Sequence, residues 1–352
     1  MSIATQKVAD SRVNQLDPKD IKFGKIYSDH MLVAKYSDGQ WHKAEIVPYG
    51  DISMSPSTTV LHYGQAIFEG IKAYKNVQGE ISIFRPEENH KRFNRSAERM
   101  GMPDVPEEIF MDGMRELISL DRNWVPDSEG CSLYIRPFMI GTDAFIGVKP
   151  AEEFAFYIIT SPAGAYYADP IRIYVHHEYT RAFPGGIGFT KAAGNYGACM
   201  YPTMQVRKLG YDQILWTDAV EHKYVQEIGT MNVFFVLNGV VVTPDLTEGT
   251  ILQGVTRDSI ITLLQTEGYT VEERPLSIDE IVEAHANGQL QEIFGAGTAA
   301  VVAPIKEIHY NGVDMQANHA GDGPVTKLIS TTLADIRYGR KEDLRGWMYK
   351  VC

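Results

Sequence analysis

The sequence is poor in cysteine, which argues against a disulfide framework and against a zinc site. Only three cysteines occur among 352 residues, and the spacing of Cys131, Cys199 and Cys352 fits neither kind of site. An odd number of widely spaced thiols is typical of a protein kept in a reducing compartment. We therefore expect a cytoplasmic location and no metal centre.

Basic charge is scarce as well, which argues against a nucleic-acid partner. The chain has 33 Lys and Arg against 45 Asp and Glu, so its formal net charge is −12 at pH 7, whereas nucleic-acid-binding proteins usually carry a basic face. No apolar run approaches the roughly 20 residues of a membrane-spanning helix. The polar segment 1–18 lacks the apolar core of a signal peptide. We expect no membrane partner either.

Nucleotide-binding motifs are weak or absent. The P-loop pattern is missing, because Lys191 lacks the required glycine before it and Ser or Thr after it. The run Gly295-x-Gly297-x-x-Ala300 fits the dinucleotide fingerprint, so a nicotinamide-dependent oxidoreductase is an alternative interpretation. However, residues 301–304 are β-branched and then interrupted by proline, which disfavours the helix that this fingerprint requires. Too little chain follows for a doubly wound domain.

The composition that remains is that of a packed globular protein with about two domains. Hydrophobic residues make up 44% of the chain, a normal proportion for a globular protein, and 352 residues correspond to about two domains of usual size. Proline, glycine and alanine replace the strand pattern in the segment at about 162–171. We place the boundary there, between an N-terminal domain at 1–168 and a C-terminal domain at 169–352.

Local patterns predict both strands and helices, and hence a mixed α/β fold. Alternating or apolar runs predict strands at 81–85, 131–136, 154–160, 211–217, 233–237 and 291–294. Helical periodicity and end signals predict helices at 86–100, 106–120, 254–267 and 324–338. Asn238-Gly239 predicts a two-residue hairpin, and Ser277-x-x-Glu280 a capping box. Segment 1–22 is expected to be a loose arm.

A single lysine stands among very small residues in the run Phe189-Thr190-Lys191-Ala192-Ala193-Gly194-Asn195-Tyr196-Gly197. Residues this small let a flat ligand lie close to the backbone. A lysine in apolar surroundings loses its charge easily, and a neutral amine can form a Schiff base with an aldehyde. Taken alone, the run fits a pyridoxal-phosphate lysine, or simply a surface lysine in a glycine-rich loop.

Other candidate residues also allow two interpretations. Period two places Tyr134 and Arg136 on one face of a strand, where they could bind a carboxylate or could merely end the strand at the surface. Arg92 lies in a basic helical segment. On composition alone, such a segment is a helix face exposed to solvent. Glu227 is a possible partner for a protonated ring nitrogen or an ordinary strand-end glutamate. Tyr196 is a possible cofactor ligand or a core tyrosine.

Several runs, taken in their order along the chain, resemble the branched-chain amino acid aminotransferases, which are fold-type-IV pyridoxal-phosphate enzymes. The resemblance extends from about residue 21 to the C-terminus. The matching runs are Phe23-Gly24, Asp29-His30-Met31, Leu61-His62-Tyr63, Phe68-Glu69-Gly70, Tyr134-Ile135-Arg136-Pro137, Gly164-Ala165-Tyr166, Lys191 to Gly197, Glu227 to Asn232 and Phe294 to Ala299.

The resemblance implies a two-domain fold-type-IV enzyme with pyridoxal 5′-phosphate as its cofactor. Lys191 would form the Schiff base and shuttle the proton, Glu227 would face the ring nitrogen, and Tyr196 would bond the ring oxygen. The residues expected to hold the phosphate are Arg92, Val255, Thr256 and Thr298. The reaction would transfer the amino group of L-leucine, L-isoleucine or L-valine to 2-oxoglutarate.

The same resemblance implies a homodimer with shared active sites. Phe68, Tyr134, Arg136, Tyr166 and the Ala299 backbone would form the substrate side. Three further residues would come from the partner subunit: Tyr63, Ile146 and Val148.

Alternatives with the same fold or cofactor remain open. They are a D-amino acid aminotransferase, an aminodeoxychorismate lyase and a non-enzymatic pyridoxal-phosphate carrier. Some family members carry a C-x-x-C redox pair after the position of Thr298. Ala300 and Ala303 stand at those positions here, so we expect no thiol switch there.

Overall fold

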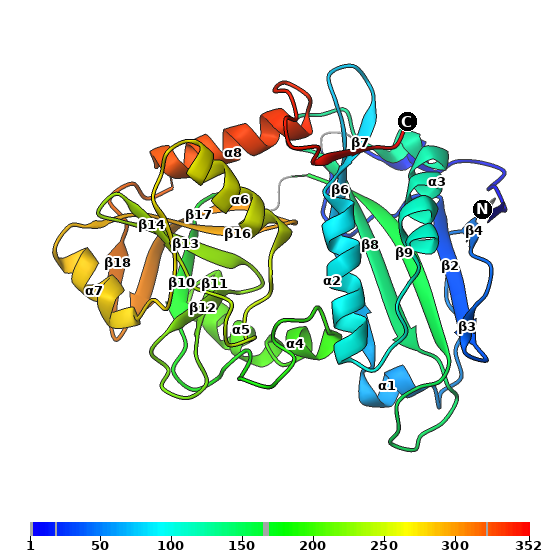
Figure 1. Cartoon of the computed structure of the whole chain (residues 1–352), viewed down its shortest axis with the longest axis horizontal. Coiled ribbons are helices and arrows are strands. Elements are labelled where there is room, and N and C mark those ends of the chain that lie inside the picture. The colour runs from blue at the N-terminus through cyan, green and yellow to red at the C-terminus, as the bar shows by residue number, and fades with distance from the viewer. Residues whose placement is uncertain (1–2, 18–19, 165–168, 322) are drawn as a thin grey trace. The chain divides into compact units, whose positions relative to one another are not determined.

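A computed structural model describes residues 3–17, 20–164, 169–321 and 323–352 of the chain (Figure 1). The chain folds into two compact units. Unit 1 comprises Met1–Tyr166, Thr190–Gly194 and Asp335–Cys352. Unit 2 comprises Tyr167–Phe189 and Asn195–Ala334. Each unit contains a large sheet and several helices, which confirms the predicted mixed α/β class.

Within the described residues, the sheet of unit 1 has ten strands, mostly antiparallel. Its main path is β1 (Ala4–Thr5), β4 (Glu45–Pro48), β2 (His30–Ser37), β9 (Phe154–Ala163), β8 (Ser132–Gly141), β6 (Ile71–Lys75), β7 (Ile81–Phe84) and β19 (Met348–Lys350). Strand β3 (Gln40–Trp41) pairs with β2, and β5 (Ala66–Phe68) pairs with β8. The helices are α1 (Thr59–Tyr63), α2 (Pro86–Arg99) and α3 (Gly113–Leu120).

Aromatic side chains attach the helices of unit 1 to its sheet. Phe93 of α2 packs edge-on against Phe156 of β9, with ring centroids 5.5 Å apart. Phe110 contacts both rings, at 5.5 Å from Phe93 and 5.8 Å from Phe156. All three side chains are fully buried. This cluster fixes α2, and therefore Arg92, on one face of the sheet.

In the part of unit 2 that the structure describes, the sheet has nine strands and mixes parallel with antiparallel pairs. Its main path is β12 (Val225–Ile228), β11 (Gln213–Thr217), β10 (Ile171–Val175), β17 (Val301–Tyr310), β16 (Leu290–Gly297), β13 (Asn232–Leu237), β14 (Val240–Thr243) and β15 (Val271–Glu273), and β18 (Val313–Gln316) pairs with β17. The helices are α4 (Ala193–Gly197), α5 (Met200–Lys208), α6 (Val255–Thr266), α7 (Ile278–Ala286) and α8 (Pro324–Arg337), of which α4 and α8 contain residues of both units.

Alternation along β13 divides its side chains between the two faces of this sheet. Val233 and Phe235 join a core cluster that includes Ile278 and Ile281 of α7. Phe234, which points the other way, stacks on Phe294 of β16 with ring centroids 5.0 Å apart. The sheet is therefore buried on both faces, as the continuous apolar sequence of β13 indicates.

Two local predictions are confirmed in geometry. Strands β13 and β14 are joined by Asn238-Gly239, whose φ angles of 48° and 83° are the positive values that a type I′ turn requires. The Ser277 hydroxyl caps α7 by accepting a hydrogen bond from the backbone N–H of Glu280 at 3.1 Å.

Three local predictions need correction. Strand β9 continues past Thr160 to Ala163, because its last residues pair with β8 up to Ser132. The helix expected at 106–120 begins with a π-helical turn, Glu108–Asp112, before α3. The N-terminal arm is held rather than loose, since Ala4 and Thr5 pair with β4.

The arm is held mainly by the buried carboxylate of Asp29. This carboxylate accepts hydrogen bonds from the Ser11 hydroxyl at 2.5 Å, the Arg12 backbone N–H at 2.9 Å and the Trp124 indole at 2.8 Å. Beside it, the backbone N–H of Val8 donates to Nε2 of His30 at 3.0 Å. Burial raises the pKa of Asp29, but these hydrogen bonds lower it by more, so the net direction is downward.

In the described ranges, no helix combines the length and the apolar character needed to cross a membrane.

We expect Asp29→Asn to lower the free energy of unfolding by about 1–3 kcal/mol, because one acceptor oxygen becomes a donor facing other donors. The pKa of Asp29 is lowered in the folded state, so its contribution is present above the unfolded value near pH 4. That contribution is lost as the pH falls through the folded pKa. Urea unfolding at pH 7 and pH 3 tests this, with the exposed turn variant Asp38→Asn as control. An Asp29→Asn deficit of equal size at both pH values would contradict it.

Candidate active site

The backbone of unit 1 holds Lys191 on both sides. Its carbonyl accepts a hydrogen bond from the Phe68 N–H at 3.1 Å, and its own N–H donates to the Ser96 hydroxyl at 3.1 Å. The next residue, Ala192, is fully buried and forms a β-bridge with Ile67. The Lys191 amine lies 4.7 Å from the centre of the Phe68 ring. Lys191 is thus held in place and is not a residue of a free surface loop.

Arg92 is buried and paired, so the interpretation of a solvated basic face is wrong for this residue. It is 4% exposed, and its Nε and Nη2 atoms donate to the two carboxylate oxygens of Glu69 at 2.7 and 2.8 Å. Asn89 and the Gly70 N–H also donate to Glu69. Full burial raises the pKa of Glu69, but the charges of Arg92 and Lys191 lower it below its ordinary value.

Tyr134 and Arg136 share one face of β8, as period two predicts. Arg136 Nη2 donates to the Tyr134 hydroxyl at 2.9 Å, and the guanidinium lies 4.6 Å from the centre of the Phe68 ring. Both residues line a cavity of about 160 Å³ together with Phe23, Gly24, Tyr27, Ile159, Thr160 and Ser161. Across the described part of the chain, the buried Arg136 Nε has no hydrogen-bond partner. A buried donor of this kind suits a carboxylate.

Gly70 makes room for this tyrosine. A Cβ atom at residue 70 would lie 2.4 Å from the Tyr134 hydroxyl, closer than any real contact allows. Glycine is therefore required at this position by the approach of the Tyr134 side chain.

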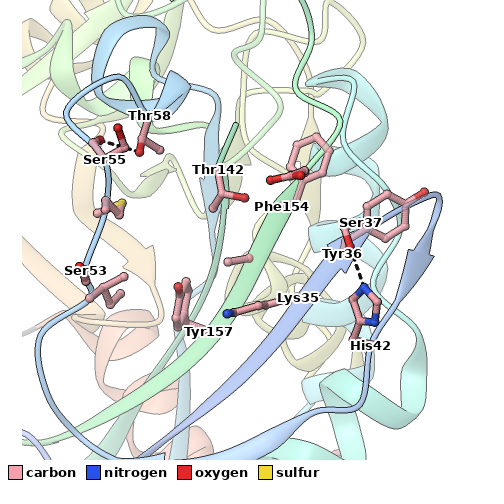
Figure 2. A pocket seen from close by; sticks show the side chains of 14 residues that line it. Lys35, Tyr36, Ser37, His42, Ser53, Ser55, Thr58, Thr142, Phe154 and Tyr157 are labelled. Atoms are coloured by element: carbon pink, nitrogen blue, oxygen red, sulfur yellow. Dashed lines mark hydrogen bonds between the residues drawn. The ribbon is translucent and has the colours of Figure 1, made fainter. Parts of the chain in front are cut away.

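A larger cavity in unit 1, of about 420 Å³, contains none of the predicted site residues. Figure 2 shows Lys35, Tyr36 and Tyr157 on its strands and the Ser37–His42 hydrogen bond at its edge. Its lining mixes a lysine, a glutamate and several hydroxyl groups without a dominant charge.

The three residues expected from a partner subunit lie on the surface of unit 1. Tyr63 is 43% exposed, Ile146 64% and Val148 89%, and Leu61 and Phe145 nearby are also exposed. The Tyr63 hydroxyl donates to the Ile146 carbonyl, which brings two of the three together. Tyr63 and Ile146 thus form one exposed apolar group on unit 1.

In unit 2, Glu227 is a buried carboxylate with fixed orientation. It is 3% exposed, and Oε2 lies 2.8 Å from Nε of Arg181. Its other oxygen, Oε1, accepts from the Leu252 N–H at 3.0 Å and from the Asn232 amide at 3.2 Å. Glu227 is thus more than an ordinary strand-end residue. Arg181 was not among the predicted site residues, although it stands beside the same glycine-rich segment as Lys191.

The start of α6 lies close to Glu227 in the same unit. Asn232, which donates to Glu227, fills the space beside Gly254, where a Cβ would lie 2.0 Å from the Asn232 amide oxygen. Gly254 is the N-cap of α6 and has no side chain to cap it. The N–H groups of Val255 and Thr256 follow in the first helical turn, where backbone donors lack intrahelical partners and suit a phosphate.

Thr298 and Ala299 lie in the turn between β16 and β17, and this turn rules out the dinucleotide interpretation. After Gly297 the chain turns and enters β17 at Val301, so a strand stands where the fingerprint requires a helix. Val301 has φ of 63°, a left-handed conformation that is costly for a β-branched residue. Such strain is found most often at ligand sites.

Two predicted residues remain. Tyr196 lies in α4 and is partly buried. Tyr166 lies outside the described residues.

Comparisons with known proteins agree with these observations. The model of the family "Amino-transferase class IV" matches residues 66–308. The chain is 46% identical over 340 residues to branched-chain-amino-acid transaminase 1 of Bacillus subtilis, covering 95% of each chain. Among solved structures, the branched-chain amino acid aminotransferase from Escherichia coli is 29% identical with a TM-score of 0.74, covering 92% of this chain and 99% of that one. The branched-chain amino acid aminotransferase from Thermobaculum terrenum in its PLP-form is 26% identical with a TM-score of 0.76, covering 92% and 98%.

We expect Glu69→Ala to lower the free energy of unfolding by about 3–5 kcal/mol, because it leaves the buried Arg92 charge without its partner. As a control, Glu88→Ala removes an exposed carboxylate that pairs with Lys91 on α2, the helix that carries Arg92. This variant should lower the free energy of unfolding by at most about 1 kcal/mol. Urea unfolding of both variants measures the difference. Equal losses would show that the buried pair has no special role.

Proposed function

The chain belongs to the class IV aminotransferases, and we propose that it transfers the amino group of L-leucine, L-isoleucine or L-valine to 2-oxoglutarate, with pyridoxal 5′-phosphate as cofactor. The observation that carries the proposal is the fixed Lys191, whose amine lies against the Phe68 ring. Relatives with 42–48% identity over nearly the whole chain are branched-chain aminotransferases, which supports the choice of substrate.

The donor groups present fit the proposed cofactor. Its phosphate needs charged or backbone donors, and the chain offers Arg92, the N–H groups of Val255 and Thr256 at the start of α6, and Thr298. Its ring nitrogen needs a carboxylate, and Glu227 is a buried one with a fixed orientation. Tyr196 would donate to the ring oxygen.

The cofactor supplies an aldehyde that accepts the amino group and a ring that accepts the electron pair of the breaking Cα–H bond. Lys191 would hold that aldehyde through Nζ. The same Nζ, when free, would accept the proton from the substrate Cα and donate it to the cofactor carbon that carried the aldehyde. Glu227 would keep a proton on the ring nitrogen, which would make the ring a better electron acceptor.

One substrate pocket must accept both an aliphatic side chain and the side-chain carboxylate of glutamate. We propose that Phe68, Tyr134, Tyr166 and the Ala299 backbone contact the aliphatic side chain. Arg136 would then bind the carboxylate, with Tyr134 beside it. Two observations support this role: the Nε of Arg136 has no hydrogen-bond partner among the described residues, and the guanidinium lies over the Phe68 ring.

We propose a homodimer in which Tyr63, Ile146 and Val148 complete the active site of the other subunit. The exposure of these apolar side chains supports this arrangement. A cytoplasmic location, inferred from the cysteine pattern, belongs to the same proposal.

Lys191→Ala should abolish turnover, because no other residue of the proposed site supplies an amine. Visible absorption spectra of the purified protein with added pyridoxal phosphate should change on addition of L-leucine and recover with 2-oxoglutarate. This response should be absent in Lys191→Ala and intact in Lys91→Ala, which changes an exposed lysine of α2. Turnover retained by Lys191→Ala would refute the assignment. A response to D-alanine alone would indicate a D-amino acid aminotransferase.

Val148→Asp should raise the dissociation constant of the dimer at least tenfold, because it places a charge in an apolar interface. A tenfold change corresponds to about 1.4 kcal/mol of binding free energy. Val77→Asp is a matched control, since Val77 is 65% exposed on the same unit and is not expected at the interface. Light scattering over a dilution series, with activity measured in parallel, compares the two variants. If Val148→Asp stays dimeric and active at every dilution, the proposed interface is wrong.

A further inference from the structure

Unit 2 contains a cavity of about 470 Å³ that the proposed function does not use. This volume lies within the usual range of small-molecule sites. One wall is Gln226 of β12. The neighbouring Glu227, the proposed cofactor carboxylate, is not among the described residues that line the cavity.

The charged residues of the lining all have the same sign. Four carboxylates contribute to it: Asp218, Glu221, Asp245 and Glu248. Among the described residues that line the cavity there is no lysine, arginine or histidine. Burial raises the pKa of Asp218, but four backbone N–H groups donate to its carboxylate and lower the pKa below its ordinary value. Asp218 is therefore charged at neutral pH, and together the four carboxylates give the lining a negative charge, which favours a cation.

A buried acceptor in the wall supplies a second, independent observation. Gln226 is 4% exposed, and within the described residues its Oε1 atom has no hydrogen-bond partner. A buried carbonyl oxygen without a donor is unfavourable, and few native side chains leave one. A ligand with an N–H donor would satisfy it. A bare metal ion fits less well, because the described residues contain no group of three or more potential ligands arranged to hold one.

The remaining lining is largely apolar and proline-rich. Ile251 and Val225 are buried in the wall, which also includes Tyr224, Pro244 and Pro275. Such a surface contacts an aliphatic chain, while the carboxylates and the Gln226 carbonyl bind charged ends that carry hydrogen-bond donors. A free amino acid is disfavoured, since its own carboxylate would meet four others.

We propose that this cavity binds a small organic cation with one or more primary ammonium groups on an aliphatic chain and no carboxylate, such as an alkyldiamine. The site is independent of the proposed transaminase function, because none of its lining residues is assigned to cofactor or substrate.

Isothermal titration of the purified full-length protein with 1,4-diaminobutane tests the proposal directly. We expect saturable binding at one site per chain, at least tenfold weaker binding of 4-aminobutanoate, and none of 1,4-butanediol. These three compounds have the same chain length and differ in charge. Equal binding of 1,4-diaminobutane and 4-aminobutanoate, or no binding of either, would overturn the proposal.

Variants distinguish diamine binding in this cavity from diamine association with the negative charge of the whole chain. The double variant Glu221→Gln/Glu248→Gln should weaken diamine binding at least tenfold, whereas Glu267→Gln, at an exposed position beyond the end of α6, should leave it unchanged. If Glu267→Gln weakens binding as much as the double variant, the diamine merely associates with surface charge and the site is refuted.

Gln226→Leu distinguishes a ligand-binding role of Gln226 from a role in the stability of the fold. It removes a buried acceptor that has no hydrogen-bond partner among the described residues, so it should weaken diamine binding severalfold without lowering the melting temperature of the ligand-free protein. Unchanged diamine affinity in this variant would show that Gln226 does not contact the ligand.

Discussion

The buried carboxylate of Glu69 is the constraint on which unit 1 depends. Its charge is tolerable inside the protein only because Arg92, Asn89 and the Gly70 N–H all donate to it. These bonds tie helix α2 to the chain just after β5. The two residues on either side of Glu69 also position site residues. The Phe68 N–H donates to the Lys191 carbonyl, and Gly70, which has no side chain, leaves room for the Tyr134 hydroxyl. Three consecutive residues thus place an arginine, a lysine and a tyrosine of the proposed active site.

In unit 2, the buried carboxylate of Glu227 is stabilised in the same way as that of Glu69. A buried carboxylate needs a cation and further hydrogen bonds, and Arg181, Asn232 and the Leu252 N–H provide them. Asn232 also packs against Gly254, so the arrangement that orients the carboxylate fixes the start of α6 as well. The proposed ring-nitrogen partner and the proposed phosphate donors are therefore positioned by one network. A substitution in this network would affect both proposed contacts at once.

Local signals in the sequence predicted the elements whose cause is local. The hairpin at Asn238-Gly239 and the cap at Ser277 depend on residues within a few positions, and both are confirmed. The same holds for Tyr134 and Arg136, which share a face because strands have period two. Predictions were wrong where distant segments decide the structure. Strand β9 continues through Pro162 because β8 offers partners there, and the N-terminal arm is held by Asp29 and β4.

The candidate site shows the same limit more sharply. Composition could not tell whether Arg92 was solvated or buried, because the deciding partner, Glu69, lies on another element. The pairing of Arg181 with Glu227 left no local signal either, since an isolated arginine near a proline-glycine turn is compatible with any role. The resemblance to a family led to Lys191, Arg92 and Glu227 as proposed site residues. It did not identify Glu69 and Arg181 as the charged partners that stabilise Arg92 and Glu227 in the protein interior. Their identification required the folded chain, because a buried charge pair is a property of two segments brought together.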